Sequence, residues 1–243
     1  MYLIRLFILA LFACGCSCGS SSFGGKMKVG VDPYWYPLDF GAQNAYVNGY
    51  TEEMLLEMSR YSGMDFELIQ ANWDTLVDGL NKKKYEAILT SMPPYEYNTA
   101  KYEFSENFLD IGPVLIVSSG SNVNELSAME KGTIGVIVND STVLVLEKHP
   151  TLIVRTYNSI TALLNAVVMG DIQGALLAKI PAVNYVGDLY AGKLKIVGAP
   201  LTDAGLHLVA LKGANLRIFN KTLRTFSRKK TLEELQKKWD LAL

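Results

Sequence analysis

The stretch FELIQANWDTLVDGLNKKKYEAILT, residues 66–90, decides the fold class. Its pattern predicts a strand over 66–69, a short helix over 74–81 and a second strand over 86–90. Strands that follow one another through a helix run parallel, because the chain has to cross back over the sheet before the second strand begins. The stretch therefore predicts an α/β protein in which helices cover a sheet.

The same alternation continues on both sides of this stretch. Before it, the sequence predicts a strand over 27–31 and a helix over 51–61, with Thr51 as the N-cap and Gly63 as the stop. After it, further strands are expected over 133–138, 152–155, 174–177, 195–197 and 207–211. The helices expected among and after these strands span 139–148 and 160–169, and two more end the chain, the last opened by a capping box at Thr231. Two such α/β units suggest two lobes with a ligand cleft between them.

The composition excludes several other classes of protein. The chain has 243 residues, 49% of them hydrophobic and 19% charged, which is typical of a globular protein with a sizeable core. Its formal net charge of −1 argues against a nucleic-acid partner, because phosphate contacts need a basic surface. The only two histidines, His149 and His207, lie far apart in the sequence. We therefore expect no metal site and no cofactor.

The amino end has the pattern of a secretory signal. Residues 1–13, MYLIRLFILALFA, place one arginine before an apolar run too short to span a bilayer. All three cysteines of the chain follow at once, as Cys14, Cys16 and Cys18. Leu11 to Cys14 resembles a bacterial lipobox, which predicts lipidation of Cys14, with Cys16 as a weaker fit. Residues 14–25 then form a lipidated flexible tether. The alternatives are an ordinary cleaved signal peptide and a CxCxC metal tract.

Several short motifs occur in an order that points to one family. They are VGVD at 29–32, WYPLDF at 35–40, NGY at 48–50, NWDTLV at 72–77, KYEAILTSM at 84–92, FS at 104–105, GV at 135–136, DST at 140–142 and the closing stretch 231–239. In this order the chain resembles the amino-acid-binding solute-binding proteins of ABC importers, family 3, as a divergent member. The resemblance covers nearly all of the chain after the tether.

The resemblance implies an architecture, a partner and a location. The expected fold is the type II periplasmic-binding-protein fold, in which each of two lobes is a sheet flanked by helices and two crossover strands form the hinge. Lobe 1 is expected at 26–111 plus 205–243 and lobe 2 at 112–204, with crossovers near 111–117 and 198–205. The resemblance also implies a lipid-anchored monomer in the periplasm or cell envelope. Its expected partners are a small molecule and an ABC permease of the inner membrane.

The resemblance also assigns aromatic side chains to the cleft. Trp35 takes the place of the aromatic residue that lines the first lobe, and Trp73 that of the ring facing it across the ligand. Two such rings would enclose an apolar or cationic ligand body. The alternative for both tryptophans is the lobe core. Asp32 ends the first strand, where its carboxylate would either face the cleft or cap the following turn.

Polar groups at strand ends complete the expected site. Thr90 and Ser91 match hydroxyls and amides that hold the polar head of the ligand. Ser141 and Thr142 match a helix N-terminus that binds the ligand carboxylate, since free N–H groups there attract anions. Plain helix capping by these two residues is compatible with that role.

Two positions depart from the family pattern. An arginine that grips the α-carboxylate of amino acids is replaced by Asn98, which carries no charge. An aspartate that takes the α-ammonium group is replaced by Ala178, with Lys179 beside it as an alternative anion ligand. Both charges of the zwitterion clamp are therefore missing.

Three functional hypotheses remain open. The first is a transport receptor for an amino acid or a related small polar solute, closing two lobes around its ligand. The second is a sensory or binding lipoprotein that keeps the fold without import. The third is a secreted enzyme of dehydratase or lyase type on the same scaffold. An enzyme needs a buried acid or base in the cleft. Asp32, Glu96 and Asp140 are the only evident candidates, and no Ser-His-Asp or Cys-His pairing can be assembled. We therefore expect no enzyme.

Overall fold

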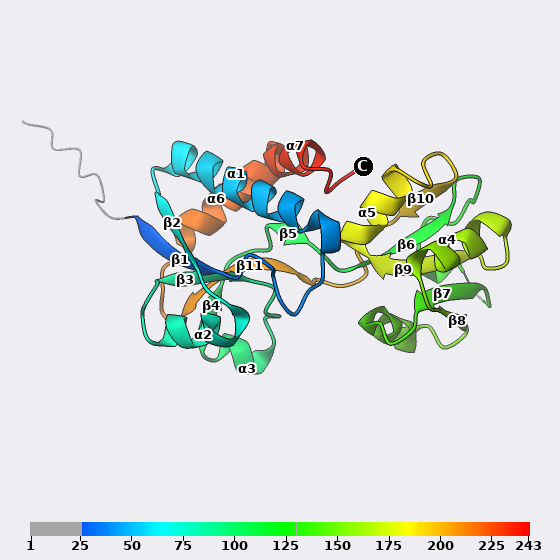
Figure 1. The fold of residues 1–243 in the computed structure, drawn as a ribbon, viewed down its shortest axis with the longest axis horizontal. Helices are drawn as coiled ribbons and strands as arrows, with labels where there is room; N and C mark the ends of the chain where they lie inside the picture. Colours follow the sequence, from blue (N-terminus) through cyan, green and yellow to red (C-terminus); the bar gives the residue numbers. More distant parts are fainter. Residues whose placement is uncertain (1–25, 130) are drawn as a thin grey trace, which may run out of the picture.

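The computed structural model describes residues 26–129 and 131–243, which form two α/β lobes lying end to end (Figure 1). We call lobe 1 the part built around a six-stranded sheet, and lobe 2 the part built around a five-stranded sheet. Helices cover the faces of both sheets. The predicted α/β, two-lobed fold class is confirmed.

The sheet of lobe 1 has the order β2-β1-β3-β11-β4, and β5 also pairs with β11. Strands β2, β1 and β3 are parallel, whereas β11 runs antiparallel to its neighbours. The strands span Met27–Val31 (β1), Phe66–Gln70 (β2), Ala87–Thr90 (β3), Tyr102–Phe104 (β4), Leu109–Asp110 (β5) and Gly205–Leu211 (β11). The last strand of the chain thus completes the first lobe.

The sheet of lobe 2 has the order β10-β6-β9-β7-β8. Strand β6 is antiparallel to both of its neighbours, and β9, β7 and β8 are parallel to one another. The strands span Pro113–Ser118 (β6), Thr133–Ile137 (β7), Ile153–Tyr157 (β8), Gly174–Ala178 (β9) and Leu194–Val197 (β10). Residues 113–117, expected in a crossover, are instead the interior strand β6, because their side chains are buried on both faces of this sheet.

The helices pack apolar stripes against these sheets. In lobe 1, Tyr50, Met54 and Met58 of α1 are buried with Phe219, Leu223 and Phe226 of α6 in one core cluster. The α-helices span Asn44–Ser62 (α1), Trp73–Asn81 (α2), Glu96–Thr99 (α3), Ile160–Met169 (α4), Lys179–Gly187 (α5), Arg217–Arg228 (α6) and Thr231–Lys238 (α7). The 3₁₀ segments span Gly41–Gln43 (η1), Leu126–Ala128 (η2) and Ser141–Lys148 (η3).

Some helix ends follow the sequence signals closely. Helix α4 begins after Ser159, whose hydroxyl accepts a hydrogen bond from the Ala162 N–H, and ends at Gly170 in the left-handed conformation with φ 79°. Helix α1 likewise ends at Gly63, with φ 74°. Glycine adopts positive φ without a steric penalty, and this is why both helices stop where the sequence predicts.

Two predicted helix starts are wrong. Thr51 is not an N-cap: α1 begins at Asn44, and the buried Thr51 hydroxyl donates to Val47 O at 2.8 Å inside the helix. Burial of Val47 and Tyr50 in the lobe 1 core extends α1 by two turns at its start. Thr231 is not a cap either, because Lys230 is the N-cap of α7 and Glu234 N donates to Lys230 O. Helix α5 was not expected at all.

Two connections join the lobes, one at residues 111–112 and one at residues 198–204. The strands β6 to β10 of lobe 2 lie between these connections in the sequence. The backbone at the first connection is bonded to both sides: Ile111 N donates to Ala204 O at 3.0 Å, and Lys179 N donates to Gly112 O at 3.1 Å. Ile180, at the start of α5, is buried in the core cluster of lobe 1. The start of α5 is therefore the packed joint between the lobes.

The predicted signal peptide and Cys14, Cys16 and Cys18 lie outside the described residues. In the part of the chain that the structure does describe, no helix combines the length and the apolar character needed to cross a membrane.

Candidate functional site

The turn after β1 is organised by Asp32. Its carboxylate is buried and accepts hydrogen bonds from Tyr34 N at 3.0 Å and from Tyr36 N at 3.2 Å. Trp35 between them has φ 58°, a left-handed conformation that is costly for a bulky residue. The two carboxylate bonds hold the turn in this conformation. Asp32 thus has the capping role that the sequence left open as its alternative.

Trp35 points into lobe 1. Its ring is 3% exposed within the core cluster, and its Nε1–H donates to Asn48 Oδ1 at 2.6 Å. This is the core placement that the sequence kept as its alternative, and it leaves no free ring face for a ligand. Because Trp35 turns inward, the flanking Tyr34 and Tyr36 are exposed by 76% and 58%.

Tyr36 and Trp73 form an aromatic pair on the surface of lobe 1. Their ring centroids lie 5.8 Å apart with an interplanar angle of 60°, within the range of favourable aromatic pairs. Trp73 begins α2 and is half-buried. Sequence reasoning selected Trp73 and missed Tyr36. The stretch Tyr34-Trp35-Tyr36 gave a usable signal, since three consecutive aromatic residues cannot all point into one core.

The end of β3 carries Thr90 and Ser91. Thr90 is buried and its Oγ1 accepts from Met92 N at 3.1 Å, whereas Ser91 is half-buried. Asn98 follows in the short helix α3, where its Nδ2 donates to Pro93 O at 2.9 Å. The Asn98 amide therefore braces the Pro93-Pro94 turn, and its carbonyl oxygen is left for other contacts.

In lobe 2, Ser141 and Thr142 begin the 3₁₀ segment η3. The preceding Asp140 is the N-cap, and its Oδ1 accepts from Thr142 N at 2.8 Å. A carboxylate bound to this N–H competes with any anionic ligand there, because it occupies the donor and repels negative charge. The buried Thr142 Oγ1, however, has no hydrogen-bond partner among the described residues.

The end of β9 lies at the joint between the lobes. Ala178 is the last residue of the strand, and Lys179 begins α5. Lys179 Nζ lies 3.7 Å from Asp110 Oδ2 of lobe 1, with the lysine side chain 17% exposed. The cation next to Ala178 is therefore engaged by a carboxylate across the joint.

The predicted residues gather at one edge of each sheet. Thr90 and the Asp32 turn follow the parallel strands β3 and β1, and Ala178 and the Ser141 turn follow the parallel strands β9 and β7. Strand β1 runs toward lobe 2 (Figure 1). Ligands of open α/β sheets bind outside the carboxyl ends of their strands, which is where these groups lie.

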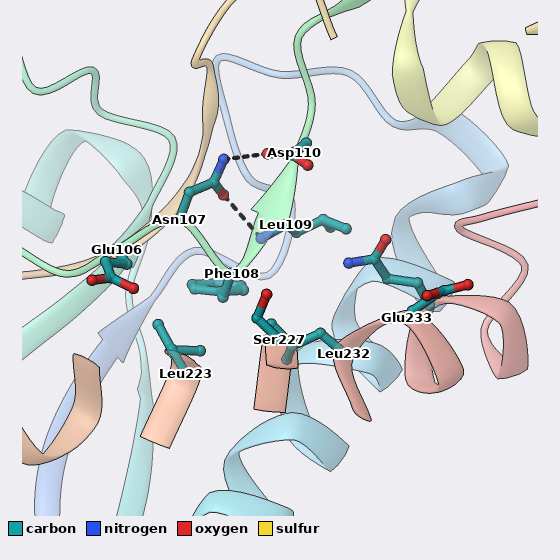
Figure 2. Close-up of a pocket in the computed structure, with 10 residues that line it drawn as sticks. Glu106, Asn107, Phe108, Leu109, Asp110, Leu223, Ser227, Leu232 and Glu233 are labelled. Atoms are coloured by element: carbon teal, nitrogen blue, oxygen red, sulfur yellow. Dashed lines mark hydrogen bonds between the residues drawn. The ribbon is translucent and has the colours of Figure 1, made fainter. Parts of the chain in front are cut away.

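A separate pocket of about 380 Å³ lies elsewhere, between the loop at 106–110 and helices α6 and α7 (Figure 2). In it, Asn107 Nδ2 donates to Asp110 Oδ1 at 2.7 Å. Of its carboxylates, Glu106 pairs with Arg224, Asp110 with Lys179 and Glu233 with Lys237. None of the predicted ligand-binding residues lines it. Because its charges already have partners, this pocket does not carry the site.

His207 on β11 lies opposite Thr90 in the lobe 1 sheet. It is 5% exposed, its Nδ1 lies 3.1 Å from Ser105 O, and its Nε2 has no partner among the described residues. Burial lowers the pKa of His207 below its ordinary value, against smaller opposing effects of the Ser105 carbonyl and Asp110. The imidazole is thus held neutral. Nowhere in residues 26–129 and 131–243 do three His, Cys, Asp or Glu side chains gather as a metal site.

Comparisons with known proteins agree with this arrangement. A family model described as bacterial extracellular solute-binding proteins, family 3, matches residues 27–242. The arginine-binding extracellular protein ArtP of Bacillus subtilis is 24% identical over 237 residues, covering 95% of this chain and 92% of that protein.

Solved structures share the fold at low identity. The L-cystine solute receptor of Neisseria gonorrhoeae in the unliganded open conformation aligns with a TM-score of 0.69 at 16% identity, covering 90% of this chain and 95% of that one. An ancestral cyclohexadienyl dehydratase aligns with a TM-score of 0.66 at 16% identity, covering 89% and 92%.

The neutral His207 gives a prediction about pH. A histidine whose pKa is lowered by folding binds fewer protons in the folded state, so stability is fully present above the unfolded pKa of about 6.5 and falls as the pH drops below it. Urea unfolding at pH 7.5 and pH 5.5 should show a smaller loss of stability for His207→Gln than for the parent. The same replacement at the half-buried His149 is the control. Equal losses in the parent and in His207→Gln would show that His207 does not titrate with folding.

Proposed function

The chain belongs to family 3 of the bacterial extracellular solute-binding proteins, and from that premise we propose that it is the extracytoplasmic receptor of an ABC importer for an amino acid or a related small polar solute. One observation carries the proposal: polar and aromatic groups follow the carboxyl ends of parallel strands in two sheets that are joined by only two connections. Closure of the two lobes would enclose a solute between these strand ends.

The ligand we propose differs from a free zwitterionic amino acid. A ligand carboxylate and ammonium need charged partners, because desolvating an unpaired charge costs several kcal/mol. Asn98 is neutral and braces the Pro93 turn, Ala178 has no polar side chain, and Lys179 lies beside Asp110. The remaining groups, which include the Thr142 hydroxyl and the Tyr36–Trp73 surface, suit a neutral or modified head group on a partly apolar body.

A binding experiment tests this ligand chemistry. Isothermal titration of the protein with each of the twenty standard L-amino acids should give weak binding or none. Asn98→Arg combined with Ala178→Asp restores both charges of the clamp and should raise amino-acid affinity about tenfold or more. Trp73→Ala should weaken the binding of any natural ligand, because it removes one ring of the Tyr36–Trp73 pair.

A matched pair of substitutions controls for added charge alone. Asn122→Arg with Ala128→Asp introduces the same residues at exposed positions of lobe 2 and should leave amino-acid affinity unchanged. Submicromolar binding of one standard amino acid by the unaltered protein would contradict the missing clamp, since other residues would then have to replace it.

An enzyme on this scaffold is the weaker alternative. The dehydratase relative shares the fold, which carries no activity by itself. Of the candidate acids, Glu96 is exposed, Asp32 accepts two backbone hydrogen bonds and Asp140 caps η3. None of the three is a buried carboxyl group free to exchange a proton with a substrate, which favours binding. A receptor that signals without import would use the same site.

We also propose that the leader is cleaved and that Cys14 is lipidated, which would anchor the receptor to the cell envelope beside its permease. Stable anchoring needs more than one acyl chain. Cys14→Ser should therefore release the protein from the membrane fraction or block its processing, as followed by fractionation and intact-mass measurement. Cys16→Ser is the control and should behave like the parent. A Cys14→Ser protein that stays as firmly membrane-bound as the parent would refute lipidation at this cysteine.

A further inference from the structure

Eight cationic side chains of lobe 1 gather at one end of its sheet, and a separate set lies along α6 and α7. Strands β1 and β3 are parallel, so their starting ends lie together. Lys26 and Lys28 lie at the start of β1, and the lysines at 82–84 form the turn that leads into β3. Lys26 and all three turn lysines are exposed.

The antiparallel strands add cations to the same end. Strand β11 pairs with β3 so that Ala210 lies opposite Ala87, which brings the end of β11 to the start of β3. Lys212 follows β11 directly, and its N–H donates to the carbonyl of Lys101, which precedes β4, at 3.0 Å. Arg217 then begins α6. We call these eight cationic residues (Lys26, Lys28, Lys82, Lys83, Lys84, Lys101, Lys212 and Arg217) the basic end of lobe 1.

Few of these charges are neutralised. Lys82 lies 2.8 Å from Asp78 and Lys212 lies 3.4 Å from Glu103. The other six have no carboxylate within ion-pair distance among the described residues. The same strand ends and turns carry five carboxylates (Asp65, Glu67, Asp78, Glu86 and Glu103) against the eight cations, whereas the formal net charge of the whole chain is −1.

The carboxyl ends of β1 and β3 carry no cation of their own. The sequence contains no Lys or Arg at 29–59 or at 85–100, which includes the turns after β1 and β3. All seven Lys and Arg residues between 26 and 110 lie at the basic end or, for Arg60, in the last turn of α1 that leads to β2. Such a one-sided distribution produces a local positive potential on a nearly neutral chain.

The described chain begins at the basic end. Strand β1, which directly follows Lys26, begins at the end of the molecule away from lobe 2 (Figure 1). Eleven residues, 15–25, separate Lys26 from the proposed anchor at Cys14, and a Gly/Ser-rich linker of that length has a root-mean-square span of about 20 Å. A tether of this length allows the basic end to approach the membrane that carries the anchor to within about 8 Å, the distance over which electrostatic attraction decays in physiological salt.

We propose that the basic end of lobe 1 binds the anionic phospholipid head groups of the membrane that carries the anchor. The inference rests on the proposed anchor. Basic residues near a surface each strengthen attachment to anionic lipid, and a lipid chain together with a polybasic patch holds more firmly than the chain alone.

Lysine labelling of the full chain in vesicles tests the inference. The chain is reconstituted in phosphatidylcholine vesicles and in vesicles with phosphatidylglycerol added, and acetylation rates are read for each lysine by mass spectrometry. Lysines 82–84, Lys101 and Lys212 should react at least about threefold more slowly on anionic vesicles, and 0.5 M NaCl should abolish the difference. Lys148 and Lys193, exposed in lobe 2, are internal controls and should react equally.

A variant separates the basic end from the anchor. Flotation with neutral vesicles reports the anchor alone, whatever the lysines do. Replacing Lys82, Lys83 and Lys84 by glutamine should remove most of the extra flotation with anionic vesicles, whereas glutamine at Lys148 and Lys193 should not. Equal labelling on both kinds of vesicle would overturn the proposal. Slow labelling in intact cells but on neither kind of vesicle would also overturn it, in favour of an acidic protein partner.

Discussion

Strand β11 is the constraint on which the two-lobed structure depends. It lies between β3 and β4 of lobe 1, and its residues up to Ala210 are buried. Because this strand comes after the whole of lobe 2 in the sequence, the chain has to leave lobe 1 at residues 111–112 and return at residues 198–204. Two lobes joined by two connections follow directly, and Ile180 of α5 packs into lobe 1 at the joint between them. Two connections of this kind are what the proposed closure of the lobes requires.

The sequence predicted the regular elements well where local signals agree with packing. Helix α4 has its cap and its stop glycine where expected, and the strand–helix–strand stretch at 66–90 folds as read. The failures have tertiary causes. Thr51 and Thr231 look like caps locally, but burial of the turns before Thr51 and the left-handed Lys230 place the helix starts elsewhere. Helix α5 was missed although Pro181 in its first turn is a local signal for a helix start.

The candidate site was predictable in its position but only partly in its side chains. Strand ends are visible in a sequence, so Thr90, Ala178 and the turns at Asp32 and Ser141 lie at strand ends as expected, and their role in binding stays a prediction. The direction in which Trp35 points depends on the φ of 58° that the Asp32 carboxylate supports, and no motif reveals that. Charge is also distributed unevenly: the turns after β1 and β3 carry no Lys or Arg, whereas eight cations of lobe 1 gather where the described chain begins.

The central claim is that the two lobes close on a solute. Small-angle X-ray scattering tests this claim most directly. The radius of gyration is measured for the protein alone and with a solute that raises its melting temperature at saturating concentration. The two-connection hinge predicts a smaller radius of gyration with the solute, because the lobes approach each other about residues 111–112 and 198–204. A solute that binds at the strand ends yet leaves the radius of gyration unchanged would contradict closure.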